Sequence, residues 1–197
     1  GVTYDTPTWF DIREQTTQYL ETRRNENGES IITVVNPNVI NVFADYRLRT
    51  PGRWGLSAAY VFGSRGLISV DYAYRDFSQT KFSSRFAGEF SPLNNTIDQL
   101  LGGSSSLRIG GEYRLDQFSL RGGWRFEGSP YQDTNILGNL NSLSMGAAYD
   151  FGNYNFGISY AYSQQERNQA LYGVGLPSTA NINTTTNNFI FTLGISL

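Results

Sequence analysis

The chain has 197 residues with 15 basic and 17 acidic side chains, and this near-neutral balance gives no electrostatic case for nucleic-acid binding. Cysteine and histidine are both absent, which excludes disulfides, thiol nucleophiles and Ser-His or Asp-His catalysis, so we expect no enzyme, no metal and no cofactor. No stretch approaches ~18 consecutive apolar residues, which excludes a helical membrane protein.

The first part of the chain predicts strands separated by turn residues. Residues 1–4 read as the end of a strand, Asp5-Thr6-Pro7 as a turn, and 8–23 as the next strand. Residues 25–38 are expected to form a loop, which carries Ile31, Ile32, Val34 and Val35. Because the chain opens within a strand, we expect further strands to precede it.

Residues 39–62 are predicted to form one long strand, with a kink or bulge at Pro51-Gly52. Its apolar residues alternate with small or polar ones and are expected to pair across the turn at residues 63–66 with the next strand. The predicted partners are Trp54, Leu56, Ala58, Tyr60 and Phe62 on one side, and Ile68, Val70, Tyr72 and Tyr74 on the other.

The connection from Ser78 to Ser105 is a candidate ligand surface. Phe82, Phe86 and Phe90 recur every four residues, and Lys81 and Arg85 lie beside them. A short helix is expected at 92–101, presenting Leu93, Ile97, Leu100 and Leu101. Two interpretations remain open and are not exclusive: a groove that captures hydrophobic ligands, or loops that pack on each other as a lid.

The clearest hairpin joins 107–115 to 118–126 through Asp116-Gln117. Antiparallel register places Glu112 opposite Arg121 and Arg108 opposite Arg125. The second pair is destabilising unless an anion intervenes, and the candidates are Asp71 or an external group such as a carboxylate. Arg108 and Arg125 are therefore candidate ligand-binding residues, although a structural network of charges is the favoured interpretation.

A second hairpin joins 143–151 to 154–162 through Gly152-Asn153, and the tail repeats its alternation from Phe189 to Leu197. The opposite face of these strands is nearly all small, which predicts space on that side. The small residues are Ser144, Gly146, Ala148, Gly157, Ser159, Ala161, Gly194 and Ser196.

These elements together predict a transmembrane antiparallel β-barrel. Each strand has about the 9–11 residues that cross a bilayer at a tilt of roughly 35–45°, and aromatics gather near strand ends as interfacial girdles. A soluble sandwich would instead place its aromatics in mid-strand. Tyr60, Tyr149, Phe156, Phe189 and Leu193 are expected to face lipid.

Short turns at 63–66, 116–117 and 152–153 alternate with long connections at 78–105, 127–141 and 164–186, which predicts a periplasmic and an outer rim. Since the last strand must finish at the periplasmic rim, counting back predicts that residues 1–4 descend, 5–7 form a periplasmic turn and 8–23 rise. The count is eight full strands and a stub.

The run from Leu48 to Gly63, the run from Gly66 to Ser78 and the segment from Ser106 to Trp124 resemble the FadL family of outer-membrane transporters in the form seen in Bacteroidetes-type bacteria. The resemblance covers most of the chain, but its motifs are strand patterns, and the terminal Leu197 departs from the usual aromatic end. It implies a fourteen-stranded barrel for long-chain fatty acids or other hydrophobic compounds, with an N-terminal hatch and sideways release through a kinked strand. Residues 1–197 would then be the C-terminal part of a single barrel domain, without the hatch and early strands.

The expected function is passive diffusion of hydrophobic molecules through a ligand-binding barrel in the outer membrane of a Gram-negative bacterium. The candidate ligand-binding residues are Lys81, Phe82, Arg85, Phe86, Phe90, Arg108 and Arg125. The alternative, also implied by the resemblance, is a binding or scaffold subunit of a secretion or surface complex, with other outer-membrane chains as partners. A self-contained eight-stranded barrel is disfavoured by the small-residue wall.

Overall fold

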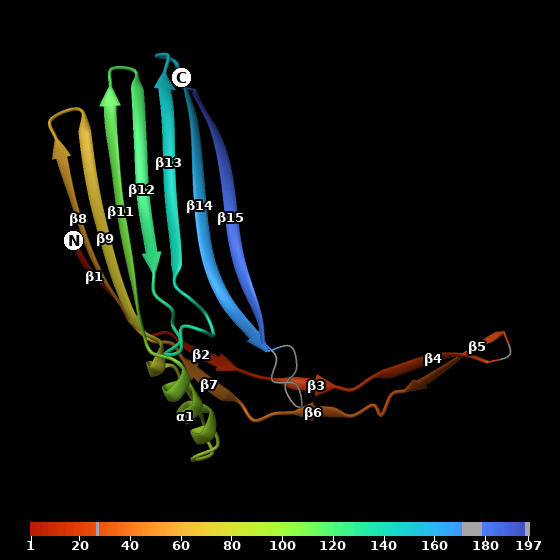
Figure 1. The fold of residues 1–197 in the computed structure, drawn as a ribbon. Coiled ribbons are helices and arrows are strands. Elements are labelled where there is room, and N and C mark those ends of the chain that lie inside the picture. The colour runs from red at the N-terminus through yellow and green to blue at the C-terminus, as the bar shows by residue number, and fades with distance from the viewer. Residues whose placement is uncertain (27, 171–178, 196–197) are drawn as a thin grey trace.

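Eight antiparallel strands form the main sheet of the computed structural model, which describes residues 1–26, 28–170 and 179–195 (Figure 1). Their spatial order is β1-β8-β9-β11-β12-β13-β14-β15. A short strand lies at one edge and the others are long: β1 (Val2–Asp5), β8 (Arg53–Phe62), β9 (Gly66–Asp76), β11 (Gly103–Leu115), β12 (Phe118–Glu127), β13 (Leu140–Asp150), β14 (Tyr154–Ala170) and β15 (Thr179–Ile195). The predicted partial barrel wall of about eight antiparallel strands is confirmed, as seven long strands and a short one.

The register of the three predicted hairpins is also confirmed. Tyr60 lies opposite Ile68, and the other pairs of β8 with β9 follow in step. Leu115 pairs with Phe118, so Asp116 and Gln117 alone connect β11 to β12. Asp116 adopts a φ of +53°, a conformation that Asp and Asn tolerate better than most side chains. The alternating pattern and the turn residues therefore determine the pairing locally.

The sheet has one strongly apolar face and builds almost no core of its own. Tyr60, Phe189 and Leu193, all predicted to face lipid, are 64%, 66% and 69% exposed. Among the described residues, the buried apolar ones are Ala73 and Pro51. A water-soluble protein rarely leaves so large an apolar surface uncovered, so this face is suited to lipid.

Short and long connections alternate between the two rims as predicted (Figure 1). The connection after β9 contains η1 (Phe77–Gln79), β10 (Lys81–Ser84) and α1 (Ser91–Leu100), so the helix expected at 92–101 forms one residue earlier. None of the helices in the described ranges is long and apolar enough to cross a membrane. The connection expected at 164–186 is mostly strand, because β14 continues to Ala170 and β15 begins at Thr179; positions 171–178 lie outside the described residues.

Residues 9–49 leave the main sheet and form a separate two-stranded arm, which extends from the rim of long connections (Figure 1). The arm pairs β2 (Trp9–Ile12) with β7 (Tyr46–Arg49), β3 (Gln15–Thr17) with β6 (Ile40–Val42), and β4 (Leu20–Glu26) with β5 (Glu29–Val35). Beside the sheet, β10 adds to β7 as a third strand. The loop expected at 25–38 is therefore replaced by a hairpin.

The predicted direction of the first strand is wrong. β1 runs antiparallel to β8, and β8 runs toward the short-turn rim, so Asp5 lies at the rim of long connections. Asp5-Thr6-Pro7 is consequently no periplasmic turn, and 8–23 is no wall strand. Charge explains why the segment after β1 does not continue as a wall strand: β4 carries Glu21 and Arg23 on one face and Arg24 and Glu26 on the other, so neither face suits lipid.

The predicted single strand 39–62 is also wrong, although its kink is in the right place. β6, β7 and β8 succeed one another, and only β8 belongs to the main sheet. The break falls at Thr50–Gly52. A Cβ on Gly52 would lie 2.8 Å from the Tyr4 hydroxyl and 3.0 Å from the Asp5 carbonyl oxygen, so glycine permits the close approach of β1 where the chain enters the wall.

Candidate functional site

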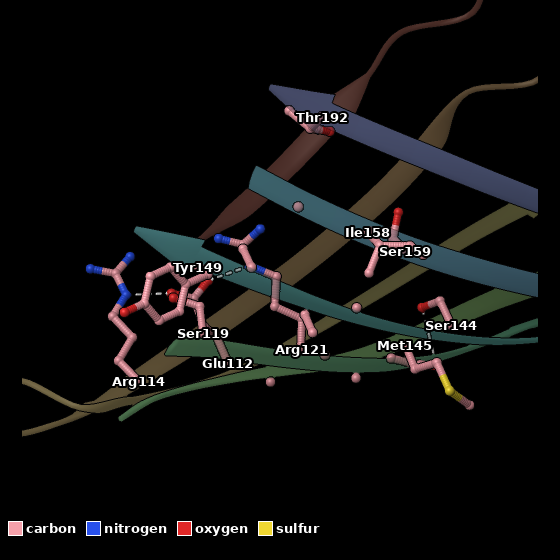
Figure 2. A pocket seen from close by; sticks show the side chains of 18 of the residues that line it. Glu112, Arg114, Ser119, Arg121, Ser144, Met145, Tyr149, Ile158, Ser159 and Thr192 are labelled. Atoms are coloured by element: carbon pink, nitrogen blue, oxygen red, sulfur yellow. Dashed lines mark hydrogen bonds and ion pairs between the residues drawn. The ribbon is translucent and has the colours of Figure 1, made fainter. Parts of the chain in front are cut away.

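Glu112 is the centre of a charged cluster on the polar face near the short-turn rim (Figure 2). It accepts hydrogen bonds from Arg121 Nε at 2.8 Å and from Arg114 Nε at 2.5 Å. The predicted Glu112 and Arg121 pair is therefore confirmed, and Arg114 joins it because residues two apart on a strand share a face. One carboxylate serves two guanidinium groups here.

A hollow of about 880 Å³ lies over this polar face. Its lining combines the Glu112 cluster with the predicted small residues, among them Ser144, Gly146, Ala148, Gly157, Ser159 and Ala161. Figure 2 shows that Glu112 and Arg121 lie in the same hollow as Ser144 and Ser159. Gly194 is not part of the lining, and Ser196 lies outside the described residues. The small-residue wall does leave usable space.

Arg108 and Arg125 lie directly opposite each other, as predicted. Both contact Glu127: Arg108 Nη2 is 3.5 Å from Oε1, and Arg125 donates to the same oxygen through Nε at 3.0 Å. Asp71, the acid expected from the neighbouring strand, is in register with Arg108, but no ion pair joins the two among the described residues. Glu127 is the acid that separates the two cations.

A second cavity of about 390 Å³ lies on the same face toward the long connections. Three guanidinium groups line it, those of Arg53, Arg75 and Arg108, and Glu127 is the one acidic residue in the lining. Arg53 and Arg75 are opposite each other on β8 and β9. The connection after β12 supplies Pro130 and Leu137 to the walls.

Lys81 is occupied by an internal partner. Its Nζ lies 2.7 Å from both carboxylate oxygens of Asp98 on α1. Beside this ion pair, Asn94 donates to the Phe82 carbonyl oxygen and accepts from the Phe82 amide, both at 2.8 Å. Asn94 therefore joins α1 to β10, because its side-chain amide makes with Phe82 the two hydrogen bonds that the backbone of a paired strand would make.

Phe82 and Phe90 belong to an aromatic cluster with Tyr46 of the arm. The ring centroids are 5.3 Å apart for Tyr46 and Phe90, 5.7 Å for Phe82 and Phe90, and 6.1 Å for Tyr46 and Phe82. The Tyr46 hydroxyl donates to Glu14 at 3.0 Å, and this hydrogen bond raises the pKa of Tyr46 above its usual value. Two of the three predicted phenylalanines are thus packed between the arm and the loop.

Phe86 stands apart from this cluster and is 52% exposed. The Arg85 guanidinium carbon lies 4.8 Å from the centre of the Phe86 ring, a cation–π distance. Of the predicted loop residues, Phe86 and Arg85 are the pair that presents an apolar ring and a cation to solvent.

Sequence reasoning missed Glu127, Arg53, Arg75 and Tyr46. Glu127 had a usable signal, since it follows Arg125 by two residues and so shares its face. Arg53 and Arg75 also fall on the polar face of the predicted hairpin. Tyr46 had no signal, because its contact with Phe90 depends on the course of the arm.

Comparison with protein families finds no matching family model. No curated protein sequence matches the chain either. By structure, the chain is similar to a Pseudomonas aeruginosa FadL homologue, with 18% identity and a TM-score of 0.49, over 98% of this chain and 47% of that one. It is also similar to the CymD monoaromatic hydrocarbon channel, with 15% identity and a TM-score of 0.44, over 83% of this chain and 42% of that one. The chain spans less than half the length of either structure.

Proposed function

We propose that this chain is part of an outer-membrane barrel of a Gram-negative bacterium, through which long-chain fatty acids or other hydrophobic small molecules pass by passive diffusion. The supporting observation is the two-sided sheet: one face is apolar and exposed, and the other carries a hollow of about 880 Å³ lined by small and charged residues. Such a wall separates lipid from a solute path.

We infer that the barrel domain includes further strands besides those of residues 1–197. Within the described ranges, β1 and β15 each have one neighbour in the sheet. A strand edge in hydrocarbon leaves unpaired N–H and C=O groups, each of which costs several kcal/mol, so an uncovered edge does not persist in lipid.

The capture step is assigned to the loop between β9 and β11. A ligand meets the exposed Phe86 first, and the Tyr46, Phe82 and Phe90 cluster forms the packed surface beneath the loop. Arg85 is the cation offered to a head group, since Lys81 is already paired with Asp98. Arg108 and Arg125 are the candidate partners further inside. Each buried methylene contributes about 0.8 kcal/mol and one charge-assisted hydrogen bond about 1.5–3, so a long tail dominates affinity.

Uptake by the intact protein in reconstituted vesicles tests this proposal. Replacing Phe86 and Phe90 by Ser should slow uptake of a long-chain fatty acid by about tenfold, which corresponds to roughly 1.4 kcal/mol, and should do so more than Arg85→Gln. Phe43→Ser, which removes an aromatic of the arm that is 51% exposed, is the matched control and should change little. Unchanged uptake in the Phe86 and Phe90 double variant would leave the loop as a lid only.

A second candidate function, a binding or scaffold subunit, is favoured by the arm. Its β5 to β6 side exposes Ile32, Val34, Ile40 and Val42 by half or more, and β4 and β3 are the strands that pair with this side in the described chain. Replacing residues 15–42 by a short Gly-containing turn, between the adjacent Glu14 and Phe43, separates the two functions. A scaffold would lose its partner chains on affinity purification and keep uptake, whereas a transporter that needs the arm would lose uptake.

A further inference from the structure

The cavity of about 390 Å³ lies on the polar face near the long connections. Its floor is made of small residues, Ala73, Ser104 and Ser106, which leave room above the sheet. Ala73 of β9 pairs with Ser106 of β11, and the two strands run in opposite directions. Arg75 follows Ala73 by two residues and Arg108 follows Ser106 by two residues, so the two arginines lie on opposite sides of this floor. Phe77, Pro130 and Leu137 enclose it.

The arginines that line this cavity are poorly paired. Arg53 approaches Asp5 only to 4.0 Å, and Arg108 approaches Glu127 only to 3.5 Å. The Nε atom of Arg75 is buried and has no hydrogen-bond partner in the described structure. By contrast, Arg47 in the arm and Arg121 on the polar face each lie 2.8 Å from their carboxylates. A buried donor without a partner is costly, and natural proteins rarely leave one unused.

The acids nearby do not neutralise the cavity. Three arginines and one acid line it, so the lining has a surplus of two positive charges. That acid, Glu127, is also bound by Arg125 through two hydrogen bonds. Asp71 faces Arg108 in the register but is not part of the lining. The carboxylates present are therefore fewer than the guanidinium groups that need them.

We infer that this cavity binds a compact oxyanion group, a carboxylate, sulfate or phosphate, held by Arg53, Arg75 and Arg108. The guanidinium fork matches planar or tetrahedral oxyanions with two parallel hydrogen bonds, and partial enclosure strengthens these bonds. Arg75 is oriented by Phe77, whose ring centre lies 5.7 Å from the guanidinium carbon. The inference goes beyond the proposed function, because it concerns oxyanions whether or not they carry an apolar tail.

Equilibrium binding to the intact protein in a neutral detergent tests the inference. The probes are inorganic phosphate, inorganic sulfate and dodecanoate, with dodecanol as the uncharged counterpart of the last. Saturable binding of at least one oxyanion is expected, and Arg75→Gln or Arg53→Gln should weaken it tenfold or more. Arg75→Lys keeps the positive charge but loses the two parallel N–H donors of the guanidinium group. Its affinity for the oxyanion should lie between that of the unaltered protein and that of Arg75→Gln. Arg47→Gln removes one exposed, ion-paired arginine of the arm and should change binding less than twofold.

The outcomes separate the possibilities. Binding of inorganic phosphate or sulfate identifies free anions as the ligand, whereas binding of dodecanoate alone identifies the head group of an amphiphile. The absence of saturable binding by every oxyanion, or equal losses in Arg75→Gln and Arg47→Gln, would overturn the inference. Heat-modifiable migration of each variant on gels shows whether the barrel still folds. If Arg75→Gln does not fold, Arg53→Gln is used for the binding measurement instead. Uptake of dodecanol that persists in Arg75→Gln shows that the proposed passage survives failure of the oxyanion site.

Discussion

Asn94 joins α1 to β10 within the connection between β9 and β11. Its side chain makes two hydrogen bonds with the backbone of Phe82, so it pairs with β10 as a strand would. The neighbouring ion pair between Lys81 and Asp98 is partly exposed, and such pairs stabilise proteins by about 0–1 kcal/mol. The amide clamp should therefore matter more than the ion pair.

Replacing Asn94 by Leu should loosen the segment from β10 to α1 while leaving the wall intact. Two lost hydrogen bonds, each with a net value of about 0.5–1.5 kcal/mol, predict a local opening that is about 5-fold to 140-fold more frequent. Amide hydrogen exchange of residues 81–100 measures this. Asn95→Leu, at an exposed neighbouring position of α1, is the control. Equal exchange in both variants would mean that the loop is held by its aromatic cluster instead.

At the scale of one strand, β13 shows how a period of two separates lipid from solute. Ala147 lies opposite the apolar Leu120 and Ile158, while Ala148 lies opposite Ser119 and Gly157. Two adjacent residues of the same type thus belong to opposite faces of the sheet.

Arginine at these two positions should have very different costs. Ala147→Arg places a charge on the lipid-suited face near mid-strand, where it should destabilise the barrel by about 2–4 kcal/mol. Ala148→Arg enters the hollow on the polar face, which already holds the charged side chains of Glu112, Arg114 and Arg121, and should cost much less. Urea unfolding in lipid bilayers, followed by gel mobility, measures both variants. Similar midpoints would contradict the assignment of faces.

The arm is the element that the sequence pattern misrepresented. In its outer hairpin, β4 carries charged residues and its partner β5 carries β-branched ones, as in Glu21 of β4 opposite Val34 of β5 and Arg23 opposite Ile32. Each face therefore mixes polar and apolar side chains, and alternation cannot separate such a ribbon from a wall strand or a loop.

At the scale of the whole molecule, the main feature is that β1 and β15, at the two edges of the main sheet, each have one neighbour among the described residues. Because the strands alternate in direction across the sheet, β1 and β15 run antiparallel to each other and could in principle pair directly to close a small barrel. This direct closure is the alternative that an experiment has to exclude. The proposal that further strands complete the barrel predicts that these edges do not meet.

Pairs of introduced cysteines test this. Thr3→Cys combined with Gly55→Cys is the positive control, because a Cβ on Gly55 would lie 3.9 Å from the Thr3 Cβ, close to the separation in disulfides. Thr3→Cys combined in turn with cysteine at Asn188, Ile190 or Thr192 should form no intramolecular disulfide in the folded intact protein. A disulfide in any of these three would contradict the proposal and favour direct closure.

The sequence by itself determined the hairpins of the wall, because turn and register lie within a few residues of each other and a slip of one residue would turn every apolar side chain away from lipid. The opposition of Arg108 and Arg125 followed from this local register. Only the tertiary structure decided the direction of β1, since its partner β8 lies about fifty residues further along the chain. The tertiary structure also determined that the arginine cavity and the Tyr46 cluster form. The cavity needs walls from the connection after β12, and the cluster needs the arm beside β10, and neither long-range contact leaves a periodic trace in the sequence.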